Sequence, residues 1–134
     1  MDNLWLWSGI LLVGLTAFLA LLFFVLRPAL QSYSPREARE LLKGGWVSRV
    51  VDVRSPEEYH TGHYRNAINV PLRDLVTALP QQISSRDHAL FFYGNQTGIS
   101  AFRAAALAQE LGYSNVRYLR YGDFQNMEVR HKFQ

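Results

Sequence analysis

The chain has 134 residues with 14 Lys and Arg, 11 Asp and Glu, a formal net charge of +3 at pH 7 and no cysteine. Without cysteine the chain can form no disulfide and can supply no thiol nucleophile. Its basic residues are spread along the sequence, so we expect no nucleic-acid partner.

An uninterrupted apolar run from Leu4 to Leu26 contains no charged residue. As a helix rising about 1.5 Å per residue it would be about 34 Å long, slightly more than the ~30 Å hydrocarbon core of a bilayer. A buried core helix is the alternative interpretation, but a domain of this size could hardly enclose a helix that is apolar on every face. A cleaved signal peptide fits less well, because Arg27-Pro28 closes the run in place of a small-residue cleavage site. We expect a retained transmembrane helix over residues 4–26.

The charges that flank this run predict its orientation. Basic residues follow the run and none precedes it, which favours a cytoplasmic C-terminal side. We therefore expect an N-terminal tail over 1–3, the transmembrane helix over 4–26, a juxtamembrane linker over 27–31 and one domain over 32–134. The expected location is a bacterial inner membrane, crossed once, with the domain in the cytoplasm.

Capping signals and a Val-rich run predict the first elements of the domain. Ser34-Pro35-Arg36-Glu37 forms a capping box that begins a helix over about residues 35–43, which Gly44-Gly45 ends. A strand is expected over 47–53. Ser55-Pro56-Glu57-Glu58 then repeats the same capping box at the start of a short helix.

The remaining segments continue to alternate strands with helices. We expect strands over 67–70, 89–93 and 116–119. The intervening helices are a helix over 71–79 with Leu72, Leu75, Val76 and Leu79 on one face, and a helix over 98–111 with Phe102, Ala105, Ala106 and Leu111 as its apolar residues. Strands that alternate with helices pair in parallel through right-handed crossovers. The predicted fold class is therefore α/β, a small parallel sheet flanked by helices.

Several spaced residues between Asp52 and Pro71 form one pattern, which reads Asp-x-Arg, Glu-Tyr, Gly-His and Ala-x-Asn-Val-Pro. This pattern resembles the rhodanese-like domain family, and the resemblance extends over about residues 32–127. It implies a rhodanese-like three-layer fold. It also implies a structural role for the motif residues, which are Asp52, Arg54, Glu58, Tyr59, Gly62, His63, Asn69 and Pro71.

The resemblance assigns particular tasks inside this motif. Asp52 and Arg54 are expected to form a buried bidentate ion pair that holds the neighbouring loops. Gly62 is expected to supply a tight turn, and Asn66, which stands where the family has glycine, to adopt a positive φ. The His60 and His63 spacing could suggest a metal site, but the resemblance makes His63 structural and leaves His60 exposed, so we expect no metal.

The loop after the predicted strand 89–93 departs from the family. Rhodaneses begin this loop with the catalytic cysteine and commonly close it with Arg-Ser, whereas this chain has Gly94, Ile99 and Ser100 at those positions. Glycine cannot carry a persulfide, and Ile99 lacks the charge that would bind a sulfur donor. A glycine-bounded loop that feeds a helix can still direct backbone N–H groups at an anion. The expected anion cradle consists of Gly94, Asn95, Gln96, Thr97, Gly98, Ile99 and Ser100.

These features lead to functional hypotheses from different classes. The leading one is a noncatalytic binding, scaffolding or regulatory module at the cytoplasmic membrane face, with a protein partner at or in the membrane and no cofactor. The alternative is a sulfurtransferase that moves sulfur from thiosulfate or a persulfide with a thiol supplied by a partner or by a small molecule such as glutathione. In a third, the loop senses an anion without turning it over, with at best millimolar affinity because Ile99 lacks a matching charge.

Overall fold

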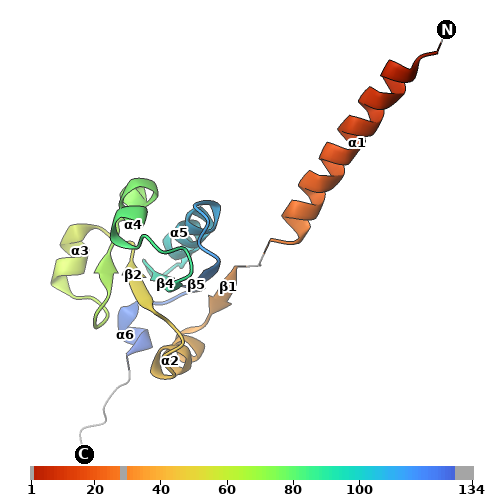
Figure 1. Ribbon diagram of the computed structural model, residues 1–134. Helices are drawn as coiled ribbons and strands as arrows, with labels where there is room; N and C mark the ends of the chain where they lie inside the picture. The colour runs from red at the N-terminus through yellow and green to blue at the C-terminus, as the bar shows by residue number, and fades with distance from the viewer. Residues whose placement is uncertain (1, 28–29, 129–134) are drawn as a thin grey trace, which may run out of the picture.

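The first element of the computed structural model, which describes residues 2–27 and 30–128, is the helix α1 over Leu4–Val25. None of its residues is buried, and all but its C-terminal end extends away from the other elements (Figure 1). By its length and apolar composition α1 could cross a membrane. These are the same features from which the anchor was predicted, so the anchor stays a prediction. Parts of the predicted linker and of the predicted domain end, residues 28–29 and 129–134, lie outside the described residues.

Five parallel strands form one sheet in the order β1-β5-β4-β2-β3. Their bounds are Gln31–Tyr33 for β1, Arg49–Asp52 for β2, Ile68–Asn69 for β3, Ala89–Tyr93 for β4 and Asn115–Leu119 for β5. The parallel α/β class is confirmed. The sequence did not predict β1, which also begins one residue inside the expected linker, because its three residues include no Val or Ile run.

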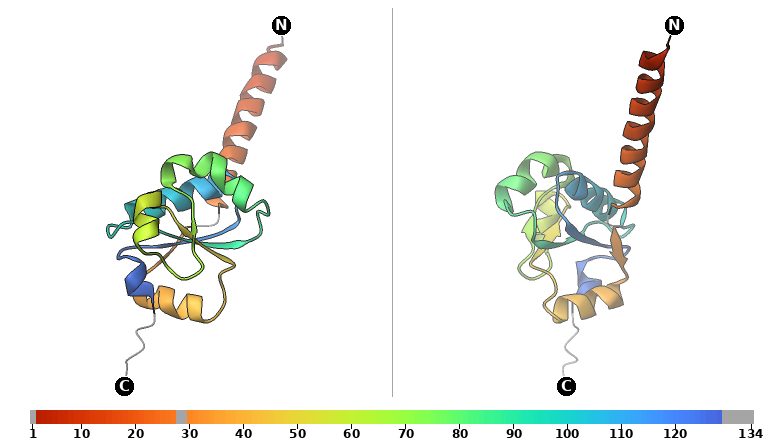
Figure 2. Two further views of the ribbon diagram at one scale, coloured as in Figure 1. Left: turned by 90° about the vertical axis from the view of Figure 1, so that its left-hand side faces the viewer. Right: turned by 45° about the vertical axis from the view of Figure 1, so that its right-hand side comes forward.

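Helices cover both faces of this sheet (Figures 1 and 2). One face packs against α4 (Leu75–Gln82) and α5 (Ile99–Glu110), and the other packs against α2 (Pro35–Lys43) and α6 (Phe124–Met127). A 3-10 turn over Leu72–Asp74 leads into α4, and α3 (Pro56–Thr61) connects β2 to β3. The domain therefore has three layers, as expected.

The strand β4 supplies both cores because every one of its residues is buried. Leu90 and Phe92 point to the α4 and α5 side, whereas Phe91 and Tyr93 point to the α2 and α6 side. This alternation follows from the two-residue period of a strand, and a parallel sheet covered on both faces requires apolar residues at every position.

The structure differs from the apolar residues expected in one helix and from the apolar face predicted for another. In α5 the buried residues are Ala101, Ala104, Ala105 and Ala108, whereas Phe102 is exposed. In α4, Leu75 and Leu79 are buried but Val76 is exposed. Small alanine side chains let the α5 backbone approach the sheet closely, so size and not apolarity decides which face of α5 is turned inward.

The two predicted capping boxes also differ. At α2 the box is complete, because the Ser34 hydroxyl accepts the Glu37 N–H and the Glu37 carboxylate accepts the Ser34 N–H. At α3 the Ser55 hydroxyl accepts the Glu58 N–H at 3.2 Å, but no reciprocal bond is formed. The second box is therefore only half formed.

Candidate functional site

The site lies where the strands end, which is the edge at which parallel α/β sheets place their ligand-binding loops. Asp52, the last residue of β2, is fully buried and forms an ion pair with Arg54, whose Nη2 lies 2.7 Å from Asp52 Oδ2. Arg54 Nε also donates to both carboxylate oxygens, at 3.1 and 3.2 Å. The expected bidentate geometry is therefore present. Arg54 Nη2 also donates to the Gly62 carbonyl at 2.7 Å.

Tyr93 completes this buried network from the neighbouring strand. Its hydroxyl donates to Asp52 Oδ2 at 2.7 Å and accepts the Tyr64 N–H at 2.9 Å. Burial raises the pKa of Tyr93 far above its ordinary value, and the hydrogen bond and charge of Asp52 raise it further. The pKa of Arg54 is also raised, because its hydrogen bond and charge interaction with Asp52 outweigh the effect of burial. The Tyr93 phenol is thus held neutral as a donor to a charged carboxylate.

The other motif residues hold the loops around this network. The Tyr59 hydroxyl donates to the Ala67 carbonyl at 2.7 Å, and the His63 ring stacks on the Tyr59 ring with centroids 3.8 Å apart. The Asn69 amide donates to the Asp52 and Arg54 carbonyls at 3.1 and 3.0 Å. Glu58 contributes its N–H to the cap of α3, Pro71 precedes the 3-10 turn, and His60 is exposed.

Two backbone expectations had different outcomes. Asn66 has φ 62°, which confirms the predicted positive φ. Gly62 has φ 164° and ψ 143°, an extended conformation open to any residue, so the predicted tight turn is wrong. Glycine is nevertheless suited to this position, because a Cβ there would lie 3.2 Å from Phe124 Cζ.

Gly94, at the position of the missing cysteine, is buried and closely surrounded. A Cβ at this residue would overlap the Ser100 Oγ and would lie 3.1 Å from Val53 Cγ2. The Ser100 hydroxyl accepts the Asn95 N–H at 3.2 Å and donates to Asn95 Oδ1 at 3.2 Å. The Ser100 hydroxyl therefore occupies the space that a side chain at residue 94 would need.

Several N–H groups of the expected anion cradle donate to atoms of the loop itself. The Asn95 N–H is taken by Ser100, the Ile99 N–H by Thr97 Oγ1 at 3.4 Å, and the Gly98 N–H by the Asn95 carbonyl at 3.1 Å. An incoming anion would have to compete with these acceptors. Anion binding therefore stays a prediction, and this bonding pattern disfavours it.

Gly98 fixes the position of the loop against the chain that follows β5. It has φ 76°, and a Cβ there would overlap the Arg120 backbone carbonyl. Nearby, the Gly122 N–H donates to the Gln96 carbonyl at 2.8 Å. Both the positive φ and the close backbone contact require glycine at residue 98.

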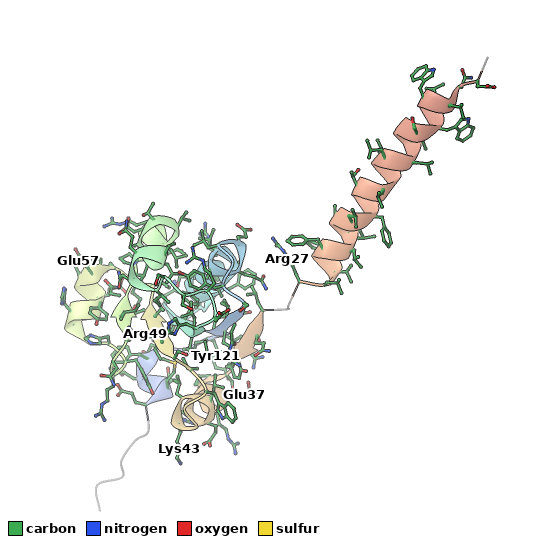
Figure 3. All side chains as sticks on the ribbon, viewed as in Figure 1. Arg27, Glu37, Lys43, Arg49, Glu57 and Tyr121 are labelled. Atoms are coloured by element: carbon green, nitrogen blue, oxygen red, sulfur yellow. The ribbon has the colours of Figure 1, made fainter. Side chains whose placement is uncertain are left out.

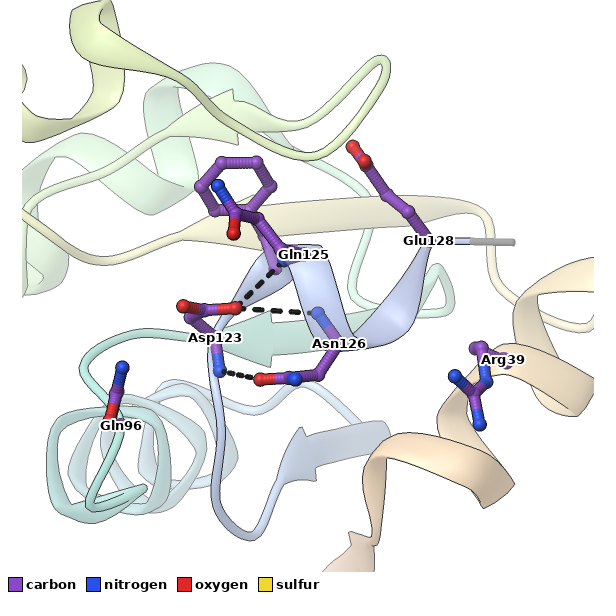
Figure 4. A pocket seen from close by; sticks show the side chains of 7 residues that line it. Arg39, Gln96, Asp123, Gln125, Asn126 and Glu128 are labelled. Atoms are coloured by element: carbon purple, nitrogen blue, oxygen red, sulfur yellow. Dashed lines mark hydrogen bonds between the residues drawn. The ribbon is translucent and has the colours of Figure 1, made fainter. Parts of the chain in front are cut away.

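A polar groove of about 750 Å³ adjoins this loop. Figure 4 shows its lining side chains, which come from α2, the loop and the α6 region: Arg39, Gln96, Asp123, Phe124, Gln125, Asn126 and Glu128. The Asp123 carboxylate accepts the Gln125 and Asn126 N–H groups at 3.0 and 3.3 Å, so it acts as the cap of α6. Among the described residues, no group of three or more His, Asp or Glu side chains is placed to hold a metal.

Sequence reasoning missed an apolar surface beside the same loop. Ile99 and Phe102 on α5 are 59% and 47% exposed, and Tyr121 after β5 is 50% exposed. Phe102 also contacts the Tyr118 ring, with centroids 5.6 Å apart. The i, i+3 spacing of Ile99 and Phe102 was the available signal, but sequence reasoning placed Ile99 in the loop and Phe102 in the helix without connecting them.

Comparisons with known proteins agree with this geometry. Residues 34–125 match the rhodanese-like domain family. The chain is similar to the thiosulfate sulfurtransferase PspE of Escherichia coli, with 30% identity over 49% of this chain and 62% of that protein, less than two thirds of its length. It is 33% identical to human thiosulfate:glutathione sulfurtransferase, over 60% of this chain and 79% of that protein. The structure of a human single-domain sulfurtransferase matches with a TM-score of 0.60 and 28% identity, over 73% of this chain and 95% of that one.

Proposed function

Because this chain belongs to the rhodanese-like domain family, we propose that it keeps the fold of a sulfurtransferase while working as a noncatalytic binding module. The observation that best supports this proposal is at Gly94. The chain has no cysteine, and the Ser100 hydroxyl fills the space where the sulfur-carrying side chain would begin. A persulfide needs a thiolate to form, and no residue of this loop supplies one.

Binding would use the edge of the domain at which the strands end. Ile99 stands where the family carries an arginine, so an apolar side chain replaces a charge at the mouth of the loop. With Phe102 and Tyr121 it gives an exposed apolar surface, and the groove of Arg39, Asp123 and Glu128 adds charges of both signs beside it. An apolar surface with a polar rim is typical of protein–protein contacts.

The proposed location is a membrane that α1 crosses once, with the domain in the cytoplasm. Its partner would be a protein at or in the same membrane, because anchoring raises the effective concentration of neighbouring proteins without any new contact. The apolar composition of α1 and the basic residues that follow it support this arrangement.

The alternative is sulfur transfer with an external thiol. A human relative carries glutathione in its name, and a glutathione thiolate could attack the outer sulfur of thiosulfate to give a glutathione persulfide and sulfite. In that case the protein would only have to hold and orient thiosulfate. The internal hydrogen bonds of Asn95, Gly98 and Ile99 make this loop a poor site for that anion.

A sulfur-transfer assay with thiosulfate, and with cyanide or glutathione as acceptor, separates these functions. We expect the wild-type chain to be inert, Gly94→Cys to gain little, and Gly94→Cys with Ile99→Arg to gain measurable turnover. Since a side chain at residue 94 displaces the Ser100 hydroxyl, adding Ser100→Ala tests whether that clash limits the gain. Turnover by the wild type with glutathione would support the alternative and refute the noncatalytic proposal.

Partner binding can be tested by cross-linking the full chain in native membranes and identifying the captured protein. Ile99→Asp and Phe102→Asp should abolish a specific cross-link, because each places a charge inside the proposed contact. Val76→Asp is the matched control, since Val76 is 52% exposed but lies on α4. A partner lost equally in all three variants would show that the contact lies elsewhere.

A further inference from the structure

The chain topology restricts which side of the domain can meet the membrane. Val25 ends α1 and Gln31 begins β1, so at most about 20 Å of extended chain separates them. Figures 1 and 2 show β1 running away from the end of α1. Because all five strands are parallel, they begin on the side of the sheet that β1 shares with α1. We call the segments at the beginning of β2 to β5, residues 43–49, 65–67, 84–88 and 111–114, the amino edge.

A contact at the end of α1 agrees with this placement. Phe23, Leu26 and Arg27 line one groove together with Gln109, Glu110, Gly112, Tyr113 and Ser114, at the end of α5 and in the turn before β5. Arg86 extends the same edge, because its Nε donates to the Leu111 carbonyl at 3.0 Å. The amino edge therefore begins directly beside α1.

The amino edge carries exposed basic side chains. Lys43, Arg49 and Arg65 are exposed, and within the described residues none of these three forms an ion pair. Acids on or beside this edge are Asp87 on the edge itself and Glu40 and Glu110 on the flanking helices. The charge of Glu128 also acts on Tyr64, next to Arg65, and raises the Tyr64 pKa after the larger effect of burial. Where the strands end, Glu57, Glu58, Asp74 and Asp123 stand among basic residues, which are Arg54, Arg73 and Arg120. Figure 3 shows Glu57 away from Arg27 and α1, and it shows Lys43 at the lower end of the domain.

Two further features of the edge suit a lipid surface. Arg49 and Arg65 line one groove of about 410 Å³ whose lining contains no acidic residue. Trp46, in the turn between α2 and β2, is 71% exposed and rests against Gly44, where a Cβ would lie 2.7 Å from its ring. Tryptophan has an apolar body and one N–H donor, which is the combination that the interface between headgroups and acyl chains favours.

We propose that the amino edge docks on the anionic headgroups of the membrane that α1 crosses, with Arg49 and Arg65 on lipid phosphates and Trp46 in the interface. This inference rests on the proposed anchor. Since α1 already holds the domain at the bilayer, weak contacts are enough to orient it. The degenerate loop, Ile99 and the groove at α6 would then face the aqueous phase, open to a partner that approaches from that side.

The test places single tryptophans in the full chain, reconstituted into vesicles with brominated acyl chains. Trp5→Phe with Trp7→Phe leaves Trp46 as the one tryptophan, since the chain has three. With phosphatidylglycerol present, Trp46 emission should shift to the blue and be quenched by the brominated lipid. Both effects should be lost with phosphatidylcholine alone. Arg49→Gln with Arg65→Gln should lower the ratio of docked to undocked chain about 25-fold, from roughly fivefold per basic residue near the surface.

Two further positions report the alternative orientations of the domain. Each tryptophan is placed in a chain whose own three tryptophans are all replaced by phenylalanine. Tyr121→Trp, at the end where the strands finish, should stay unquenched. Phe102→Trp should also stay unquenched, since it reports the α5 face. Quenching at either position, or a Trp46 equally open to water in both lipids, would overturn the proposal.

Flotation of the same vesicles keeps this failure distinct from failure of the anchor. A chain that does not float with the vesicles would refute the anchor and the docking together. A chain that floats while Trp46 stays in water would refute the docking alone. Circular dichroism of each variant shows that a loss of quenching does not come from unfolding.

Discussion

At the scale of single residues, Asp52 governs the stability of the domain. It is the buried charged residue of the described chain, and Arg54, Tyr93 and the Arg54 backbone N–H all donate to its carboxylate. A buried carboxylate is tolerated only when its oxygens are bonded in this way. The motif that this chain shares with the rhodanese-like family thus serves folding here.

Removing one partner of this pair should be costly. Arg54→Leu leaves the Asp52 carboxylate buried without its main counter-charge, so we expect the free energy of unfolding to fall by about 3–5 kcal/mol. Arg73→Leu is the control, because Arg73 pairs with Asp74 at 3.6 Å with both side chains largely exposed, and its loss should cost less than about 1 kcal/mol. Denaturant titration of the full chain in detergent measures both. Equal losses would show that Asp52 is not held as the structure indicates.

The raised pKa of Tyr93 predicts how the free energy of unfolding depends on pH. Its pKa in the folded domain is raised by burial and by Asp52, so the folded state keeps a proton that the unfolded chain releases above its ordinary pKa of about 10. This contribution is complete below pH 10 and is lost as the pH rises beyond it, by up to about 1.4 kcal/mol per pH unit. In Tyr93→Phe the fall above pH 10 should be shallower, although stability at pH 7 is lower because the bond to Asp52 is gone. Tyr64 and Tyr113, whose pKa values are also raised, should leave part of the slope. A slope unchanged by the substitution would contradict the assignment to Tyr93.

At the scale of elements, the sequence predicted those that carry their own local signals. The Ser34 box and Gly44 bound α2 correctly, and the apolar run over 89–93 matches β4 residue for residue. These elements depend on caps and on burial on both faces, which neighbouring residues encode. The half-formed cap at Ser55 shows that a box pattern can be present without both of its bonds.

The elements that the sequence did not predict depend on distant partners. β1 exists because Gln31 to Tyr33 pair with residues 117–119 of β5. α6 has a local signal in its Asp123 capping box, but its Met127 also packs into a core with the distant Phe91 and Tyr93. Likewise, the exposure of Phe102 follows from the close approach of the α5 alanines to the sheet. At the site, the empty position at Gly94 could be read from the motif, but the Ser100 hydroxyl that fills it could be found only from the fold.

At the scale of the whole molecule, different side chains lie at the two ends of the sheet. The end where strands begin carries Lys43, Arg49, Arg65 and Trp46, whereas the end where they finish carries the closed loop, the apolar Ile99 and charges of both signs. Because the candidate site lies at the finishing end, turning the other end to a membrane would not cover it. The orientation that we propose therefore leaves the candidate site as the surface offered to a partner.

The separation of α1 from the domain leads to a prediction for the whole chain. None of the α1 residues is buried, and the core residues of the domain come from residues 38–127. Deleting residues 2–26 should therefore release the domain to the soluble fraction without changing its fold, with a free energy of unfolding within about 0.5 kcal/mol of that of the full chain in detergent. Fractionation, circular dichroism and denaturant titration of the two forms measure this. If the shortened chain lost cooperative unfolding, α1 would be a core helix of the domain, and both the anchor and the orientation derived from it would fall.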